Sequence, residues 1–119
     1  MSITREQRRA RTAYACVRAV RANEGVFNEY RTAVNGLGPN TLRSGLSAAM
    51  AFLERDRDRP AVRTLLGDLG SFHLPGLQGA TADTLPDKVR ALPVTEYMLA
   101  TRELLKAVQW LKRACQAEA

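Results

Sequence analysis

Apolar side chains recur along most of this chain every three or four residues, the spacing that places them on one side of an α-helix. The first such pattern consists of Ala10, Ala13, Tyr14, Val17 and Val20. Thr4 is followed three residues later by Gln7, which fits a capping box, so we expect a first helix from about residue 5 to residue 23. Arg8, Arg11 and Arg18 then lie on the side opposite the apolar residues.

Three further patterns of this kind occupy the middle of the chain. One contains Phe27, Tyr30, Val34 and Leu37. We expect the glycines and proline of residues 36–39 to end this helix. The next pattern predicts a helix from Leu42 to about Arg57, and the third a helix that Asp58 caps and that ends near Gly70.

The last third of the chain begins with a break in the periodicity. Residues 74–83 carry a proline and two glycines, so they are expected to form a loop. Of all segments, this loop is the best candidate for disorder or for a structure that depends on a partner. A short helix is expected over residues 86–92, and Thr95 is placed to cap the last helix. One face of that helix carries Tyr97, Thr101, Leu104, Val108, Leu111 and Cys115.

Nothing in the sequence alternates between apolar and polar as a surface strand does. The fold predicted is all-α, a compact bundle of about five to six helices in a single domain over residues 1–119. Hydrophobic residues make up 45% of the chain and charged residues 25%, the balance of an ordinary folded protein.

The charge of the chain adds a candidate partner. The formal net charge is +6, and fifteen of the eighteen basic residues are arginine. Arginine suits bidentate contact with phosphate, so a nucleic-acid surface is one explanation, and an arginine-rich proteome is the other explanation of the arginine bias. Besides the first helix, Arg102, Lys106 and Arg113 form a stripe about 16 Å long on the last helix.

Residues that carry out catalysis are sparse. Cys16 and Cys115 lie far apart in sequence with no neighbouring histidine, so we expect no zinc site. His73 is the single histidine, which leaves no pair for acid–base work, and we expect a surface or capping role for it. The sequence therefore predicts no enzyme, no metal and no cofactor. No apolar run is long enough to cross a membrane, and we expect a cytoplasmic protein.

Two residues of the last helix do not fit a single buried face. Trp110 falls nearly opposite the apolar stripe, so another helix of the chain, a neighbouring subunit or a stacked base is needed to cover it. Lys112 falls among apolar positions, where it either extends its charge to solvent beside the end of the helix or holds an anion at the rim of the core.

Two segments resemble the characteristic segments of the Cmr complex small-subunit family, the small subunit of type III-B CRISPR effector complexes. Residues 37–53, LGPNTLRSGLSAAMAFL, are similar to the family's Leu-Pro, Leu-Arg-Thr, Gly-Leu and Ala-Phe-Leu pattern, with one residue fewer before the second glycine. Residues 96–114 contain Glu-Tyr, Thr-Arg-Glu-Leu-Leu and Trp-Leu-Lys-Arg-Ala in the order of the family's closing sequence.

The resemblance implies a non-catalytic subunit in antiviral defence. Copies of it stack head to tail beside the backbone that carries the crRNA, line the target RNA with a basic face and meet the large subunit. The residues expected to face RNA are Arg18, Arg21, Arg43, Lys112 and Arg113, the last three because they match motif positions. Leu46, Phe52 and Leu111 are expected in the core. The alternative is a helical protein–protein adaptor with no nucleic-acid role.

Overall fold

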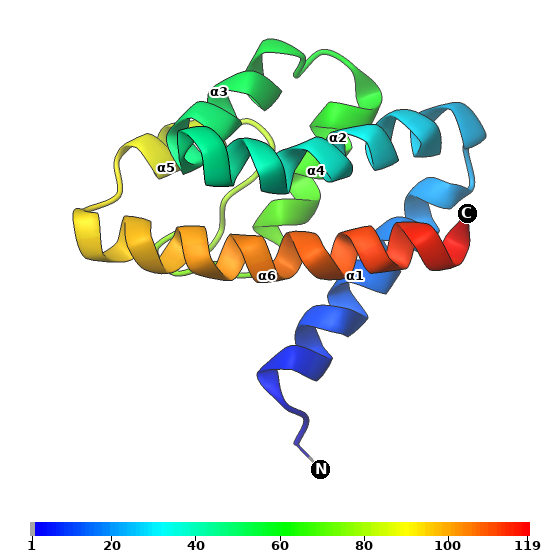
Figure 1. Ribbon diagram of the computed structural model, residues 1–119, viewed down its shortest axis with the longest axis horizontal. Helices are drawn as coiled ribbons and strands as arrows, with labels where there is room; N and C mark the ends of the chain where they lie inside the picture. The colour runs from blue at the N-terminus through cyan, green and yellow to red at the C-terminus, as the bar shows by residue number, and fades with distance from the viewer. Residues whose placement is uncertain (1) are drawn as a thin grey trace.

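The computed structural model describes residues 2–119, and within them the chain forms six α-helices and no strand. The helices are α1 (Arg5–Arg21), α2 (Glu24–Ser44), α3 (Leu46–Arg55), α4 (Pro60–Gly70), α5 (Leu85–Arg90) and α6 (Val94–Glu118). In Figure 1, α1 crosses one side of α6, and α2 runs along another side with α3, α4 and α5 beyond it. The expected all-α bundle is confirmed.

The first helix begins where the sequence predicts. The Thr4 hydroxyl accepts a hydrogen bond from the Gln7 amide at 3.0 Å, and the Gln7 side chain accepts one from the Thr4 amide at 2.7 Å. This reciprocal pair satisfies two backbone donors that a helix leaves free at its start. Ala13, Val17 and Val20 are buried, so the apolar side of α1 is the side that packs on the bundle.

The expected end of the second helix at residues 36–39 is wrong, because α2 continues through Pro39 to Ser44. A proline inside a helix removes one backbone hydrogen bond and costs about 3 kcal/mol. Leu37 and Thr41 are buried on either side of it, and burial of such side chains offsets a cost of this size. The helix ends instead at Gly45, whose φ of +91° suits glycine.

Two apolar residues of this region, Leu42 and Phe52, lie outside the core. Leu42 belongs to the last turn of α2 and is 75% exposed, whereas α3 begins only at Leu46. Phe52 is 51% exposed, so its expected core position is wrong. Leu46 and Leu111 are fully buried, as expected.

The ends of two later helices differ in detail from the prediction. Arg59, not Asp58, is the N-cap of α4, and Pro93, not Thr95, is the N-cap of α6. Neither an arginine nor a proline side chain has an oxygen that can accept a hydrogen bond, so neither helix has a side-chain cap. A proline at or next to the first position fixes the entry of the chain in both.

The connection between α4 and α5, residues 71–84, is a series of turns rather than a helix, as expected. It is anchored on the bundle by Leu74 and Leu77, whose exposed fractions are 3% and 1%. These buried leucines hold the loop against its own chain, so it does not depend on a partner for its position.

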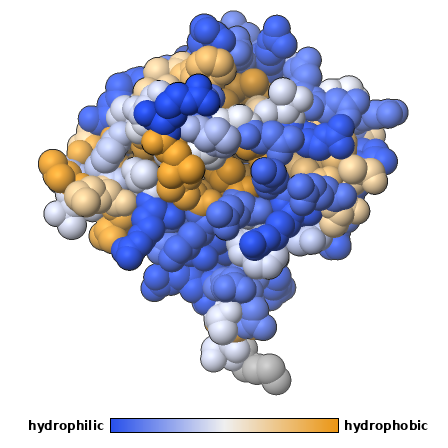
Figure 2. Space-filling view, viewed as in Figure 1, coloured by the Kyte–Doolittle hydropathy of each residue, from blue (hydrophilic) through white to orange (hydrophobic). Residues whose placement is uncertain are grey.

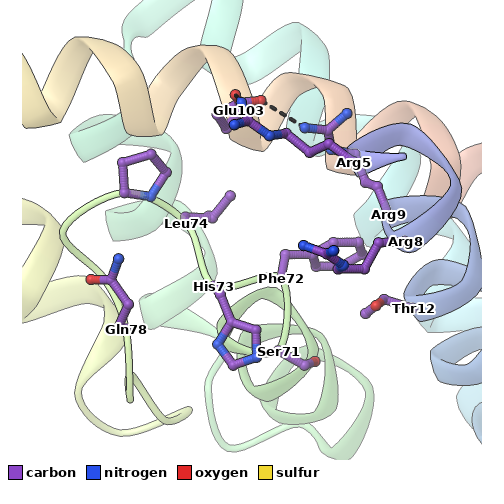
Figure 3. Close-up of a pocket in the computed structure, with 11 residues that line it drawn as sticks. Arg5, Arg8, Arg9, Thr12, Ser71, Phe72, His73, Leu74, Gln78 and Glu103 are labelled. Carbon is purple, nitrogen blue, oxygen red and sulfur yellow. Dashed lines mark hydrogen bonds and ion pairs between the residues drawn. The ribbon is translucent and has the colours of Figure 1, made fainter. Parts of the chain in front are cut away.

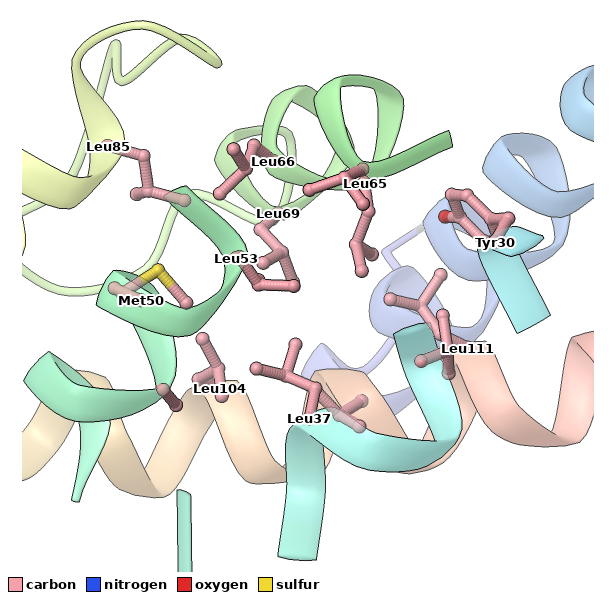
Figure 4. Close-up of a cluster of buried hydrophobic side chains, with 14 of the residues drawn as sticks. Tyr30, Leu37, Met50, Leu53, Leu65, Leu66, Leu69, Leu85, Leu104 and Leu111 are labelled. Atoms are coloured by element: carbon pink, nitrogen blue, oxygen red, sulfur yellow. The ribbon is translucent and has the colours of Figure 1, made fainter. Parts of the chain in front are cut away.

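One apolar cluster joins all six helices and this loop (Figure 4). A polar group enters it at Tyr30 of α2, which is fully buried and donates a hydrogen bond from its hydroxyl to Asp68 Oδ2 of α4 at 2.8 Å. Burial, followed by the nearby Asp68 charge, raises the pKa of Tyr30, and burial raises the pKa of Asp68. This bond satisfies a hydroxyl that would otherwise be buried without a partner.

Gly70 and Gly67 of α4 offer a matched test of this packing. A Cβ at Gly70 would lie 2.4 Å from the backbone carbonyl oxygen of Ala80, which cannot move aside as a flexible side chain could. G70A is therefore expected to destabilise the fold by about 1–3 kcal/mol. A Cβ at Gly67 would meet only the Ala82 Cβ at 4.0 Å, so G67A is expected to stabilise by about 0.5–1 kcal/mol through helix propensity. Urea unfolding measures both, and equal effects of the two substitutions would contradict the described path of the loop.

Candidate nucleic-acid interface

The side of α1 that faces away from the bundle carries a row of arginines. Arg8, Arg11 and Arg18 are exposed, and ten residues of helix separate the first from the last, about 15 Å. In the part of the chain that the structure describes, no carboxylate lies within 4.0 Å of the guanidinium group of Arg8 or Arg11. Figure 2 shows hydrophilic side chains over this part of the molecule.

A pocket of about 380 Å³ opens between the first half of α1 and the loop after α4 (Figure 3). We call it the α1 pocket. Helix α1 contributes three arginines to its lining, and the loop contributes polar and ring-bearing side chains. The lining residues are Arg5, Arg8, Arg9, Thr12, Ser71, Phe72, His73, Leu74, Pro75, Gln78 and Glu103.

Glu103 of α6 fixes the arginines on one side of this pocket. Its carboxylate lies 2.8 Å from Arg9, 3.5 Å from Arg5 and 3.8 Å from Lys106. The side chains of Arg9 and Glu103 are only 13% and 15% exposed, so their ion pair is largely removed from solvent. Among the lining residues three arginines face one glutamate, which leaves an excess of two positive charges.

The other end of α1 lies beside the end of α6. Arg18 Nε is 3.5 Å from Glu118 Oε2, and Arg21 Nε donates a hydrogen bond to the Glu118 carbonyl oxygen at 2.7 Å. The guanidinium groups also lie over rings, Arg18 over Tyr14 and Arg21 over Phe27, each 5.3 Å from the centroid. A second, shallow hollow follows α1 beside Arg11, Tyr14 and Arg18.

The stripe of cations on α6 is exposed, as the helical spacing requires. Arg102, Lys106 and Arg113 all face solvent. The Arg113 guanidinium lies 4.7 Å from the centre of the Trp110 ring, within the range of a cation–π interaction. Lys112 is exposed, which agrees with the first of its two expected roles, a charge extended to solvent near the end of the helix. Thr101 and Leu105 on the same side of α6 are half-buried.

Trp110 is half-buried and packs against the core of its own chain. The alanines beside it, Ala100, Ala107 and Ala114, are fully buried. They lie on the side of α6 where Glu103 and Glu118 meet α1, so α1 covers the second apolar face of α6. Within the chain, α1 covers the alanines beside Trp110, and the outer part of Trp110 itself remains accessible.

Arg43 lies apart from the other residues that were expected to face RNA. It is exposed in the last turn of α2. Gly38 of α2 lies against Val108 of α6, and Gly45 after α2 lies against Tyr97, so the two helices run antiparallel. Arg18 and Arg21 are at the opposite end of α6, beside Glu118. The structure thus brings Arg18 and Arg21 together at that end and places Lys112 and Arg113 on nearby turns, but it does not add Arg43 to them.

The end of the molecule that includes Arg43 also carries uncovered apolar side chains. Val94, Met98 and Leu99 in the first turns of α6 are 76%, 66% and 42% exposed, and Leu42 of α2 is 75% exposed. We call these four residues the apolar end. Figure 2 shows hydrophobic side chains gathered where α6 begins. Exposed apolar groups of this kind are typical of protein contacts.

Burial raises the pKa values of the two cysteine thiols. Burial, with the Asp68 charge as the second cause, raises the pKa of Cys16 to about 11, and burial raises the pKa of Cys115 to about 11. Both thiols are thus protonated and unreactive near neutral pH. Over residues 2–119 no cluster of ligands for a metal ion is found, and no helix there is long and apolar enough to span a membrane.

The α1 pocket is the feature that the sequence did not predict. Glu103 stood in a recognisable segment of the last helix, yet nothing in the spacing connects it with Arg5 and Arg9, more than ninety residues earlier. His73 was expected only at the surface or at a cap. The one local signal, four prolines and glycines between residues 70 and 79, predicts turns but not what they face.

Comparisons with known proteins agree across the whole chain. The family model described as CRISPR-associated protein (Cas_Cmr5) matches residues 5–118. The CRISPR system Cmr subunit Cmr5 of Thermus thermophilus is 34% identical over 114 residues, which covers 96% of this chain and 95% of that protein. The crystal structure of a CRISPR-associated Cmr5 family protein from the same organism, also 34% identical, superimposes with a TM-score of 0.83, covering 98% of this chain and 97% of that one.

The buried pair of Arg9 and Glu103 gives a stability prediction. E103Q leaves the Arg9 guanidinium without a carboxylate in a largely buried position, so we expect it to lower the free energy of unfolding by about 2–4 kcal/mol. E6Q changes the same functional group on the exposed side of α1 and is expected to stay within about 0.5 kcal/mol of the parent. Chemical denaturation measures both, and an E103Q protein as stable as E6Q would contradict this role of the pair.

Proposed function

Since the chain belongs to the CRISPR-associated Cmr5 family, the small-subunit family of type III-B effector complexes, we propose that it is a non-catalytic subunit that stabilises guide and target RNA through contacts independent of sequence. In this proposal several copies stack head to tail along the crRNA-bearing backbone of a cytoplasmic ribonucleoprotein and meet its large subunit. The complex would act in antiviral defence.

The observation that carries the RNA contact is the set of exposed cations without a carboxylate partner. Arg8 and Arg11 on α1, and Arg102, Lys112 and Arg113 on α6, all face solvent, and none pairs with an acidic side chain within the described residues. Guanidinium groups in this state are available to phosphate oxygens, and such contacts release counterions whatever the base sequence.

The residues proposed to face RNA are Arg18, Arg21, Arg43, Lys112 and Arg113. Arg18 and Arg113 retain exposed guanidinium groups that lie over Tyr14 and Trp110, an arrangement that leaves their outer edges open to phosphate. Arg43 lies toward the other end of α6, so an extended strand that touched it as well would run along the helix rather than across it.

Contact between copies is supported by the apolar end. Its four side chains are uncovered within the chain, and a head-to-tail arrangement needs two different patches on each copy. We propose Trp110 as a residue of the second patch, because its outer part is accessible and aromatic residues often anchor subunit contacts. An adaptor without RNA would use the same patches but would leave the unpaired cations without a role.

Fluorescence anisotropy with labelled single-stranded RNA across a salt series tests the RNA contact. R43Q/K112Q/R113Q removes three exposed cations that have no carboxylate partner among the described residues. It is expected to weaken binding at low salt and to reduce the slope of log affinity against log salt by about 2, since each phosphate contact contributes about 0.7. The cause is the loss of three phosphate contacts without a change in the buried core.

A matched control separates these contacts from general charge. R55Q/R59Q/R63Q removes three exposed arginines from the other side of the bundle, each within 4 Å of an acidic partner, and lowers the net charge from +6 by the same three units. We expect it to leave the slope unchanged. Equal losses in the two triple variants would show that the net charge alone attracts RNA and would contradict the proposal.

A further inference from the structure

The α1 pocket presents two arginines that are free to take an anion. Arg8 has no carboxylate partner in the described part of the chain. The Arg5 side chain is 80% exposed, and its guanidinium group lies 3.5 Å from the Glu103 carboxylate, which makes a loose ion pair. Arg9 is different, because it is mostly buried and holds Glu103 at 2.8 Å. The cationic wall of the pocket thus has one fixed member and two that can turn toward a ligand.

The opposite wall is the loop of residues 71–78, and it holds His73 in an unusual backbone conformation. The φ of His73 is +51°, in the left-handed region that residues other than glycine rarely adopt. Among residues 2–119, His73 is the only residue besides glycines with a positive φ. The buried Leu74 and Leu77 fix the loop, so packing maintains this strain. As Figure 3 shows, His73 and Gln78 lie across the hollow from Arg5 and Arg9.

The composition of the pocket selects among anions. A volume of about 380 Å³ is at the lower end of the range for sites that hold small organic ligands. The rings of Phe72 and His73 offer flat surfaces that inorganic phosphate cannot use, and Gln78, Thr12 and Ser71 offer hydrogen-bond donors and acceptors that suit the polar edge of a base. Glu103 repels a polyphosphate, and the excess of two positive charges matches a single phosphate group.

We propose that the α1 pocket binds one nucleotide unit, with the phosphate on Arg5 and Arg8 and the base against His73 and the polar groups of the loop. The proposal deepens the RNA-binding function, on which it rests for the source of the nucleotide. A nucleotide of an RNA strand and a free mononucleotide share this chemistry, and the experiment distinguishes them. The strained His73 is then explained, because its conformation places a ring opposite the phosphate site.

Two-dimensional NMR of the full-length, isotope-labelled chain tests the pocket with adenosine 5′-monophosphate as the probe. Saturable shifts are expected in the backbone amides of residues 5–12 and 71–78. Adenosine and inorganic phosphate, added separately, are each expected to bind roughly tenfold or more weakly, because each lacks one of the two sets of contacts. Shifts that are absent, or that fall mainly on residues 102–113, would overturn the proposal, as would equal binding of phosphate and the nucleotide.

Three variants locate the contacts. R8Q is expected to weaken nucleotide binding roughly tenfold, since it removes a charged donor. H73G relieves the left-handed strain, so the loop should be retained, and it is expected to weaken the nucleotide while leaving phosphate unaffected. R63Q, an exposed arginine far from the pocket lining, is the matched control for R8Q and is expected to have no effect. Equal effects of R8Q and R63Q would contradict the site.

An RNA octamer added to the nucleotide-bound protein identifies the source. Displacement of the nucleotide supports the site with an RNA strand as its ligand, and retention of the nucleotide supports it with a free nucleotide. If adenosine 5′-monophosphate does not bind but the octamer binds the parent protein and H73G with the same salt dependence, the pocket proposal fails and the proposed function stands. If the octamer does not bind at any salt concentration either, both fail.

Discussion

Helix α6 has to bury two of its faces at once, and the arrangement of the other elements follows from this constraint. One face, with Leu104, Val108 and Leu111, meets α2 and the core, and the other is lined by the fully buried Ala100, Ala107 and Ala114. Alanines at intervals of seven residues leave a smooth, shallow side on which α1 lies. Because α1 is held there by its apolar stripe, Arg8, Arg11 and Arg18 lie on its outer side. The first turns of α1 extend past α6 and form one wall of the α1 pocket (Figure 1).

Pairing between charges decides which of the many arginines remain available. Glu103 holds Arg9 and attracts Arg5 and Lys106, and Glu118 lies beside Arg18 and Arg21. These two carboxylates attach α1 to α6 at both ends. Arg8, Arg11, Arg102, Lys112 and Arg113 have no carboxylate partner among the described residues and lie on the outer sides of these two helices, where most of the proposed RNA surface is placed.

Much of the fold follows from local patterns in the sequence. The capping box at Thr4, the apolar stripes of α1, α4 and α6 and the turns after Gly70 are as expected, because each depends on residues close in sequence. The end expected at residues 36–39 failed because tertiary packing outweighed the preference of one proline. The sequence left open whether Lys112 reaches solvent or holds an anion at the rim of the core, since spacing alone does not tell which apolar faces are covered.

The candidate site was predictable only in part. The outer arginines of α1 and the α6 stripe follow from helical geometry, whereas the α1 pocket combines residues 5–12, 71–78 and 103, which only the folded chain brings together. The family segments named Arg43 together with Lys112 and Arg113 but could not say how far apart they lie, and the antiparallel course of α2 places Arg43 toward the other end of α6.

The central claim, that the outer sides of α1 and α6 lie along RNA, is tested most directly by photo-crosslinking in the assembled effector complex. Target RNA containing 4-thiouridine is bound to the guide-loaded complex and irradiated, and the adducts on this subunit are assigned by mass spectrometry. The account predicts adducts within residues 5–21 and 102–113. Adducts confined to α3 and α4, residues 46–70, or their absence from this chain while the neighbouring subunits carry them, would contradict it.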